Sequence, residues 1–524
     1  MTALELKSIK SHGKLDPKLD QLYKTCMSGS GLGKRAVLNS SMVLLYTVSP
    51  FNLWCELFAP KEERDPEPES MKILAKIGHI EEERYVEEKY PGMQRVEVET
   101  VEDAFFQVVK GCFDGVAAFH SAPLIYLPER MMGIPDLLER KNDHKSVFGN
   151  HHYIIKEKKT TKEPKQKHVL QTAFNNYVLG EIQGYTPPSF IILNRENEEF
   201  NFAYDDYTNQ LQDSISGIRE IIAGGTVTPT KGALLEPWIS YGLTKAKEIG
   251  DISLVAGIGP AKKELLSKIG IRTISDLVKA DVNLPKIKGV GSEGLAKWRT
   301  QATALLQDRI IAINAPALPE CTTTIFLDFE ATYDLSNLYL EDLGIDSTER
   351  WANIIYLIGS LIVQNGRREY VPYFADSIDC EEKIFKQFIA MLKTKRDFVI
   401  YHYAPYEKTH VKRMLLKYGI RDDFTNAMID LSYVLKNCAV FPTYGYGLKE
   451  VAKRLGFKWS EQGMDGFLSI AYYLNYIRNH DETEIRPILK YNEEDCIATS
   501  VVKDFLDSLN PQVGGSKQEK TLRG

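Results

Sequence analysis

The chain has 524 residues, of which 43% are hydrophobic and 26% are charged, and its formal net charge is −6. This length is too great for one hydrophobic core and predicts about three or four domains of ordinary globular composition. The net charge excludes a protein coated in positive charge, but it leaves room for local basic patches that bind nucleic acid.

The seven cysteines lie far apart, and none forms a CxxC pair. This spacing predicts unpaired thiols in a reducing compartment rather than a disulfide framework. The longest apolar run near the start, Met42 to Val48, is too short to span a bilayer, and no basic-then-apolar leader opens the chain. We therefore expect a cytoplasmic protein with no membrane partner.

Patterns of apolar residues and of Gly and Pro breaks divide the chain into segments, which together predict an α/β multidomain protein. In chain order these are a polar extension (1–45), an α/β domain (46–207), a connector (208–250), short helices separated by glycine turns (251–308), a second α/β domain (320–510) and a polar tail (511–524).

The first α/β domain carries a group of acidic and basic residues. Asp136 ends a Gly-Ile-Pro-Asp turn, and about twenty residues later an apolar strand start runs into Glu157 and Lys159. Glu157 and Lys159 alternate onto one face of that strand. The arrangement suits phosphodiester hydrolysis, because the two acids can hold a metal ion while the lysine positions or activates water and steadies phosphate charge. An acid followed by an ExK also occurs by chance in many chains.

Two flanking residues strengthen this interpretation: His79 lies on an upstream helix, and Gln171 lies on the helix that follows the strand. The order resembles the RecB-like branch of the PD-(D/E)XK nucleases, which implies a restriction-endonuclease-like α/β domain. By that resemblance His79, Asp136 and Glu157 are metal ligands, Lys159 is catalytic and Gln171 acts in the site. The family often has QxxxY here, whereas Asn175 stands four residues after Gln171.

Many of these relatives hold an iron–sulfur cluster with one early and three late cysteines. Cys55 stands at the early position, but no cysteine occurs between Cys112 and Cys321. The late ligands are therefore missing, and we expect no cluster and a Cys55 that packs as a small apolar residue.

The middle segment repeats a Gly-x-Gly turn between short amphipathic helices. Glycine turns bring backbone amides close to a phosphate at a helix N-terminus. The doubled device resembles a tandem helix-hairpin-helix domain, a small all-α domain that binds the nucleic-acid backbone without reading sequence. A purely structural use of the same fold is the alternative. The residues expected at the backbone are Gly257, Gly259, Lys262, Lys263, Gly289, Gly291 and Lys297.

The second α/β domain opens with the strand-like stretch TIFLDFEATYD, in which Asp328 and Glu330 share one face with Phe326. Two carboxylates on one face, about 7 Å apart, can hold a divalent metal, although a lone DxE is weak evidence. Downstream, two more strands, a helix and a strand lead to Glu407, which opens a helix. A final helix places Tyr491 and Asp495 four residues apart on one face.

The segments LDFEAT, YHYAPYE and YNEEDCIAT resemble the three motifs of the DEDD exonucleases, of the tyrosine subtype and nearest to the YprB type, which implies a ribonuclease-H-like fold. The second-motif acid is Glu407, where proofreading domains have Asp. The resemblance implies two Mg²⁺ or Mn²⁺ ions held by Asp328, Glu330, Glu407 and Asp495, with Tyr491 orienting or deprotonating the attacking water. Asp430 is expected to be structural.

The whole arrangement resembles two-nuclease proteins with a RecB-like and a YprB-type domain. It implies a metal-dependent nuclease that trims DNA 3′→5′ with its C-terminal domain and cuts single strands with its N-terminal domain, in repair or in defence. DNA with free ends is the expected partner, with a helicase as a further candidate. The alternatives are an RNA-processing exonuclease, or a single-site exonuclease whose N-terminal domain only binds nucleic acid.

Overall fold

The computed structural model describes residues 16–29, 37–91, 93, 100–280, 291–332, 354–460 and 463–509. The chain divides into two compact units, residues 1–67 with 71–245 and residues 68–70 with 246–524. Across these described ranges, no helix is long and apolar enough to cross a membrane.

The first unit is built around a mixed five-stranded sheet with the order β2-β5-β6-β7-β8, in which β6 and β7 run parallel. A smaller sheet has the order β1-β4-β3. The helices of this unit are α2 (Pro17–Cys26), α3 (Ser40–Val48), α4 (Pro50–Phe58), α5 (Glu69–Lys89), α6 (Val101–Asp114), α7 (Gln166–Gln183) and α8 (Thr208–Ile222). Its strands are β1 (Leu38–Asn39), β2 (Ala118–His120), β3 (Leu124–Tyr126), β4 (Met131–Gly133), β5 (Leu137–Lys141), β6 (His152–Lys158), β7 (Ser189–Leu193) and β8 (Glu199–Ala203).

Strand β6 and helix α7 form the centre of this unit. Six of the seven residues of β6 are buried, as expected of a strand with neighbours on both sides. Helix α7 is buried around most of its circumference, packs against β6 and β7, and ends at Gly184 with a φ of 66°. The core also takes in Leu19 of α2 and Leu211 of α8, so the packed unit extends beyond the range 46–207 expected from the sequence.

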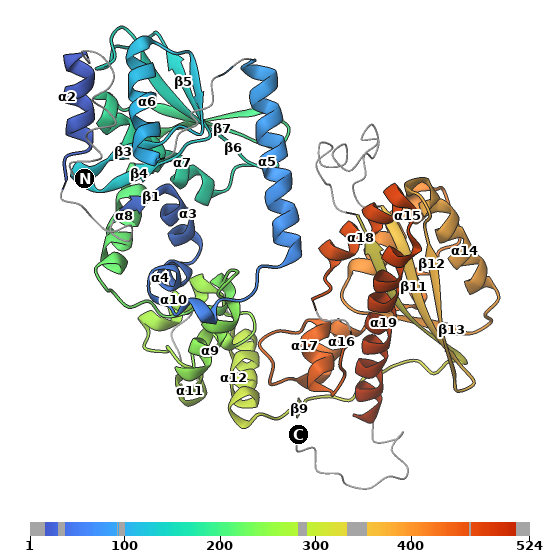
Figure 1. The fold of residues 1–524 in the computed structure, drawn as a ribbon. Coiled ribbons are helices and arrows are strands. Elements are labelled where there is room, and N and C mark those ends of the chain that lie inside the picture. Colours follow the sequence, from blue (N-terminus) through green and yellow to red (C-terminus); the bar gives the residue numbers. More distant parts are fainter. Residues whose placement is uncertain are drawn as a thin grey trace. The chain divides into compact units, whose positions relative to one another are not determined.

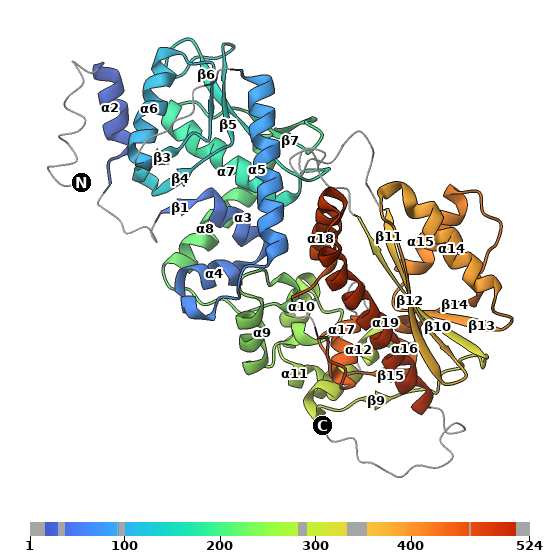
Figure 2. The ribbon, with the colours of Figure 1, turned by 45° about the vertical axis from the view of Figure 1, so that its right-hand side comes forward.

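The second unit begins with a cluster of helices, coloured green in Figure 2, and continues into a second α/β domain. The cluster holds α9 (Ile239–Glu248), whose first residues belong to the first unit, α10 (Pro260–Lys268), α11 (Ile274–Lys279) and α12 (Ser292–Gln307). The remaining helices are α14 (Glu381–Lys393), α15 (Tyr406–Lys417), α16 (Leu431–Cys438), α17 (Leu448–Arg454), α18 (Gly466–Asn479) and α19 (Ile485–Ser508). The strands are β9 (Ile311–Ala312), β10 (Thr323–Ala331), β11 (Ile355–Gln364), β12 (Arg367–Phe374), β13 (Phe398–His402), β14 (Met428–Asp430) and β15 (Ala439–Val440).

The main sheet of the second unit has the order β12-β11-β10-β13-β14. The first three strands form an antiparallel meander, and β13 and β14 join it in parallel. Parallel pairing requires a helical crossover, and α14 and α15 lie at the corresponding places in the sequence. The strands and helices read from the sequence are present, but β13 ends at His402 instead of running to Glu407. Ala404, with a φ of 73°, turns the chain into α15.

Helices cover both faces of this sheet (Figure 1). Phe326 of β10 packs in one core with residues of α16, α17 and α19. Tyr373 of β12 pairs with Ile358 of β11 and lies on the opposite face of the sheet. The centroid of its ring is 5.8 Å from the ring centroid of Phe388 in α14. Because side chains alternate along a strand, Asp328 and Glu330 point with Phe326 toward the α19 side.

Candidate active sites

The first candidate site lies where β10 meets α19. Asp328 pairs with Gly359 and Glu330 with Leu357 on the neighbouring strand β11. The register then shifts between Glu330 and Ala331, a bulge that leaves Tyr356 without a direct partner on β10. The Tyr356 hydroxyl lies 2.7 Å from the Ser469 hydroxyl of α18, and both groups lower the pKa of Glu330 against the effect of its burial. Side chains from two further elements therefore affect the second acid of the pair.

Helix α19 brings an acid and two polar side chains to Asp328. Asp495 and Tyr491 lie one turn apart, and burial together with the charge of Asp495 raises the pKa of the Tyr491 hydroxyl. Between them, the Asn492 amide donates to Oδ2 of Asp328 at 2.7 Å. The approach of α19 to β11 is so close here that a Cβ on Gly359 would lie 1.5 Å from the Asn492 side-chain oxygen. Glycine at position 359 is therefore required for this contact.

Glu407 comes from the first turn of α15 and is 4% exposed. Its Oε2 atom lies 3.4 Å from Nδ1 of His402, but that ring nitrogen is hydrogen-bonded to the Ala404 carbonyl at 2.7 Å. Within the described ranges, Oε2 of Glu407 and Nε2 of His402 are both buried without a hydrogen-bond partner. A buried carboxylate oxygen without a hydrogen-bond donor is able to serve as a ligand to a cation.

The four acids affect one another electrostatically. Burial, with the charges of Asp495, Glu330 and Glu407, raises the pKa of Asp328 well above its usual value. Burial and the charge of Asp495 raise the pKa of Glu330 to about 8. Burial also raises the pKa of Asp495 to about 6, despite a hydrogen bond from Trp459 and the charge of Lys449, and burial raises the pKa of Glu407. Carboxyl groups that cannot all ionise together attract a cation.

The carboxylates do not converge on a common point as they stand. In the part of the chain that the structure describes, no three His, Cys, Asp or Glu side chains form a group that could hold a metal ion. Two of the acids instead accept hydrogen bonds from separate donors, namely Asn492 for Asp328 and Trp459 for Asp495. The donor set still fits Mg²⁺ or Mn²⁺, which prefer oxygen ligands, because it consists of mutually repelling carboxylates with one oxygen unpaired.

Asp430, the remaining acid near Glu407, has a structural role. Its Oδ1 accepts hydrogen bonds from the backbone amides of Ala404, Ser432 and Tyr433. These bonds cap helix α16 and fix the turn after β13. Asp430 therefore orients the loop that carries Glu407.

The second candidate site lies in the first unit, at the end of β6. The Lys159 ammonium lies 2.9 Å from Oε2 of Glu157 and 3.9 Å from Oδ2 of Asp136. The backbone amide of Lys158 holds Oδ2 of Asp136 at 2.7 Å. Burial and the nearby Glu157 raise the pKa of Asp136 strongly, and the two acids raise the pKa of Lys159 against the effect of its own burial. The three residues expected from the D…ExK pattern thus lie together.

Helix α7 supplies a further contact to this site through Asn175. Its amide nitrogen donates to Oε1 of Glu157 at 2.7 Å, so the residue four positions after Gln171 contacts one of the two acids. Gln171 precedes Asn175 by one turn and lies on the same helix face. Oε1 of Gln171 is buried without a hydrogen-bond partner among the described residues.

His79 does not lie with these residues. Its side chain is 68% exposed on α5, and Nε2 lies 3.4 Å from Oε1 of Glu83. One turn along the same helix, Glu82 raises the pKa of both Asp136 and Lys159 and lies 2.7 Å from Nε2 of His120. Glu82 and His120 were not expected from the sequence. The sequence offered one signal for Glu82, which is that it lies three residues after His79 on the same predicted helix.

Cys55 is fully buried in a small apolar cluster with Phe51 and Trp238. Burial raises the pKa of its thiol to about 12. Cys55 is therefore packed as a small apolar side chain in this unit.

The glycines and lysines that were expected at the nucleic-acid backbone lie in different surroundings. Gly257 has a φ of 86°, and Gly259 and Gly291 begin helices α10 and α12 with open space at their Cα atoms. Lys262 is bonded to the Gly257 carbonyl at 3.0 Å, and Lys297 is an exposed partner of Glu293. Lys263 instead forms a 2.6 Å ion pair with the buried Asp251 and is only 14% exposed, and Gly289 lies outside the described residues.

The comparison with protein families assigns part of the chain. Residues 338–507 match RNase_H_2, a family of the RNase_H superfamily. The C-terminal domain is therefore ribonuclease-H-like, a fold class that indicates a nuclease-type phosphodiester hydrolase. The matched range contains Glu407, Tyr491 and Asp495 and begins after Asp328 and Glu330. A comparison with curated proteins gave no match.

Proposed function

We propose that the chain is a metal-dependent nuclease whose C-terminal domain removes nucleotides from the 3′ end of DNA. The observation that carries this proposal is the meeting of acids from three elements, Asp328 and Glu330 on β10, Glu407 on α15 and Asp495 on α19, each with a raised pKa. Buried acids that raise one another's pKa values are a feature of functional sites more than of stable cores.

Asp328, Glu330, Glu407 and Asp495 are the residues that would hold the divalent cations. When bound, such ions polarise the scissile phosphate and lower the pKa of a water nucleophile. Asn492 holds the carboxylate of Asp328 toward α19. Trp459, in the loop after α17, holds the carboxylate of Asp495. These two donors hold the acids in place before the cation binds.

Tyr491 acts on the attacking water as a hydrogen-bond donor. Burial and the charge of Asp495 raise the pKa of its hydroxyl far above neutral, so the hydroxyl keeps its proton. The Lys449 ammonium lies 4.7 Å from the Tyr491 ring centroid, which fixes the ring by a cation–π contact. In this proposal Tyr491 orients the attacking water.

The first unit holds the second nuclease site in this proposal. Asp136 and Glu157 would hold a cation, and Lys159, which stays protonated because both acids raise its pKa, steadies charge on the phosphate. We place Gln171 and Asn175 at the edge of this site because they share one face of α7. Glu82 takes the place at the site that the sequence pattern gave to His79.

A binding role without catalysis is the alternative for this unit. One observation favours it: Glu157 is already paired with Lys159 and Asn175, so a cation must displace one of these contacts to bind. In either case Gly259 and Gly291 begin helices α10 and α12, and the backbone amides of such helix starts can contact a phosphate chain.

The proposal is tested with single-stranded DNA and RNA labelled at the 5′ end and incubated with Mg²⁺ or Mn²⁺. Wild-type protein should shorten the DNA stepwise from its 3′ end, and Asp328→Asn should abolish this ladder. Stepwise shortening of RNA alone would assign the enzyme to RNA processing. No shortening of either polymer by the wild type would refute the proposal.

A further inference from the structure

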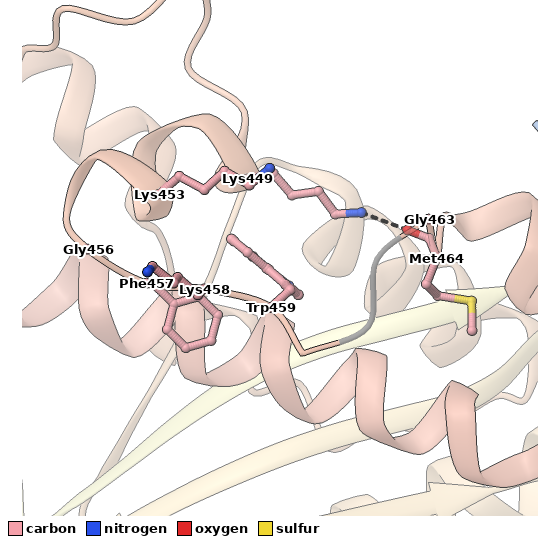
Figure 3. Close-up of a pocket in the computed structure, with 8 residues that line it drawn as sticks. All are labelled: Lys449, Lys453, Gly456, Phe457, Lys458, Trp459, Gly463 and Met464. Carbon is pink, nitrogen blue, oxygen red and sulfur yellow. Dashed lines mark hydrogen bonds between the residues drawn. The ribbon is translucent and has the colours of Figure 1, made fainter. Parts of the chain in front are cut away.

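A hollow of about 600 Å³ is lined by Trp459 and Lys449, which contact Asp495 and Tyr491, and by further residues that have no role in the chemistry described above. Helix α17 and the loop after it line the hollow. Its wall is formed mainly by Lys449, Lys453, Phe457, Lys458, Trp459 and Met464 (Figure 3).

The hollow is cationic. It is lined by three lysines and by no Asp or Glu among the described residues. Lys449 donates to the Met464 carbonyl at 2.9 Å, as the dashed line in Figure 3 shows. Within the described ranges, the ammonium groups of Lys453 and Lys458 have neither an ion pair nor a hydrogen bond. In a chain with a net charge of −6, such a cluster favours an anionic ligand.

Two aromatic rings stand beside the lysines. Phe457 and Trp459 are half-buried, and their ring centroids lie 4.7 Å apart in a T-shaped arrangement. Both rings line the hollow (Figure 3). Aromatic faces next to basic side chains are the combination with which proteins bind single-stranded nucleic acid, since bases stack on the rings while phosphates contact the cations.

Two of the residues that line the hollow contact Asp495 and Tyr491. Trp459 donates from its indole nitrogen to Oδ1 of Asp495 at 2.8 Å. Lys449 lies over the ring of Tyr491. A strand whose terminal phosphate reaches the acids can therefore place its neighbouring nucleotides in the hollow.

We propose that this hollow binds the single strand next to the phosphate that is cut. Lys453 and Lys458 contact backbone phosphates, and the ring of Phe457 stacks on a base without selecting its identity, while Trp459, perpendicular to Phe457, contacts the base with its edge. The ligand class is a single-stranded oligonucleotide, with the phosphodiester and base chemistry that DNA and RNA share. This inference rests on the nuclease function proposed above and names the substrate subsite of the same site.

The test compares the full-length variant Lys453→Gln/Lys458→Gln with the matched variant Lys383→Gln/Lys386→Gln. The latter removes two lysines from α14, which covers the opposite face of the sheet. Trimming of short single-stranded DNA and RNA oligonucleotides is measured at several salt concentrations. For the hollow variant we expect a raised KM and a nearly unchanged kcat. The slope of log affinity against log salt should become smaller by about 1.4, because two phosphate contacts are lost and each contributes about 0.7 for a single strand. The α14 variant should match the wild type.

A second variant, Phe457→Leu, tests stacking while keeping an apolar side chain in place. It should raise KM by about 5-fold or more, the lower limit for the loss of one stacked base.

Equal KM values and salt slopes for the hollow and α14 variants, in an enzyme that trims, would overturn the inference and leave the nuclease function standing. Weaker oligonucleotide binding by the hollow variant than by the α14 variant, in a protein that trims nothing, would support the subsite and refute the nuclease. Binding of a poly-glutamate peptide equal to that of the oligonucleotide, and unaffected by Phe457→Leu, would assign the hollow to acidic proteins and overturn the inference.

Discussion

The side-chain amide of Asn492 on α19 donates to Oδ2 of Asp328 on β10 at 2.7 Å, and the Tyr370 hydroxyl donates to Oδ1 of the same Asn492 at 2.8 Å. The second bond fixes which end of the amide faces Asp328. Asn492 therefore determines the orientation of an acid on a different element. This relationship was not visible in the sequence, where Asn492 is simply the residue after Tyr491.

We predict that Asn492→Ala lowers kcat by about 10- to 100-fold, because a hydrogen bond to a charged group contributes about 1.5–3 kcal/mol. KM for the oligonucleotide should change little, since Asn492 holds an acid in place rather than the substrate. Thermal unfolding checks that the variant is folded. A folded Asn492→Ala enzyme with the wild-type kcat would show that the contact does not position Asp328.

Glu381 at the start of α14 provides a stability prediction away from the acid cluster. It is 1% exposed and accepts hydrogen bonds from the Ile355 amide, Arg413 and Lys417. Burial alone would raise its pKa, but these donors and Tyr418 outweigh burial and lower the pKa below its usual value. Stability from this lowered pKa is present above about pH 4.5 and is lost as the pH falls through the folded-state value.

Glu381→Gln should therefore lower the free energy of unfolding by on the order of 1–3 kcal/mol at pH 7, a range reduced because Arg413 and Lys417 are partly exposed to solvent. Near pH 4 the difference from the wild type should shrink. Urea unfolding at the two pH values measures both quantities. A difference that grows on acidification would mean that the Glu381 contacts do not depend on its negative charge.

The acid cluster predicts the opposite pH trend when no divalent cation is present. Glu330 and Asp495 have folded-state pKa values raised to about 8 and about 6. In the folded protein these groups keep protons that the unfolded chain has already released, so stability should fall as the pH rises from about 5 to 8, by on the order of a few kcal/mol.

Millimolar Mg²⁺ should reverse this loss, because a cation that binds only the folded state stabilises it by mass action. Thermal unfolding at pH 5.5 and pH 8, with Mg²⁺ or with EDTA, measures the effect. In an Asp136→Asn background, which removes the proposed cation site of the first unit, the Mg²⁺-dependent rise in Tm should be larger at pH 8 and absent once Asp328→Asn is added. An equal rise in that variant would place the cation elsewhere.

A pair of variants on α5 separates the two candidate residues of the first unit. Glu82→Gln should slow cleavage by the N-terminal site about tenfold or more, because Glu82 interacts electrostatically with both Asp136 and Lys159. His79→Gln, on the exposed side of the helix, should change the rate less than about threefold. The measurement is made in an Asp328→Asn background. The reverse ranking would restore His79 as the helix ligand.

Much of the C-terminal fold follows from local pattern. The alternation in TIFLDFEA places Asp328 and Glu330 on one face, and the spacing of Tyr491 and Asp495 places both on one side of a helix. Such periodicities are local, so they can be read from one sequence.

The residues that hold these acids in place could not be predicted in this way. Asn492, Trp459 and Asn175 reach their partners because separate elements approach one another in the folded chain, as α19 does at Gly359. The extent of the first unit was underestimated for a similar reason, since α2 and α8 join its core only through long-range packing. The residues from Lys453 to Trp459 combine lysines with aromatic rings, a composition typical of nucleic-acid binding. Only the structure shows that this run lies beside Asp495.

The most direct test of the two-site account uses the wild type, Asp136→Asn, Asp328→Asn and the double variant on end-labelled single-stranded DNA, duplex DNA and RNA with Mg²⁺ or Mn²⁺. Products are resolved at single-nucleotide resolution. The account predicts that Asp328→Asn removes the stepwise 3′ ladder, that Asp136→Asn removes a different set of products, and that the double variant is inactive. If Asp136→Asn changes nothing while Asp328→Asn abolishes all cleavage, the first unit is not a nuclease and the two-site account is wrong.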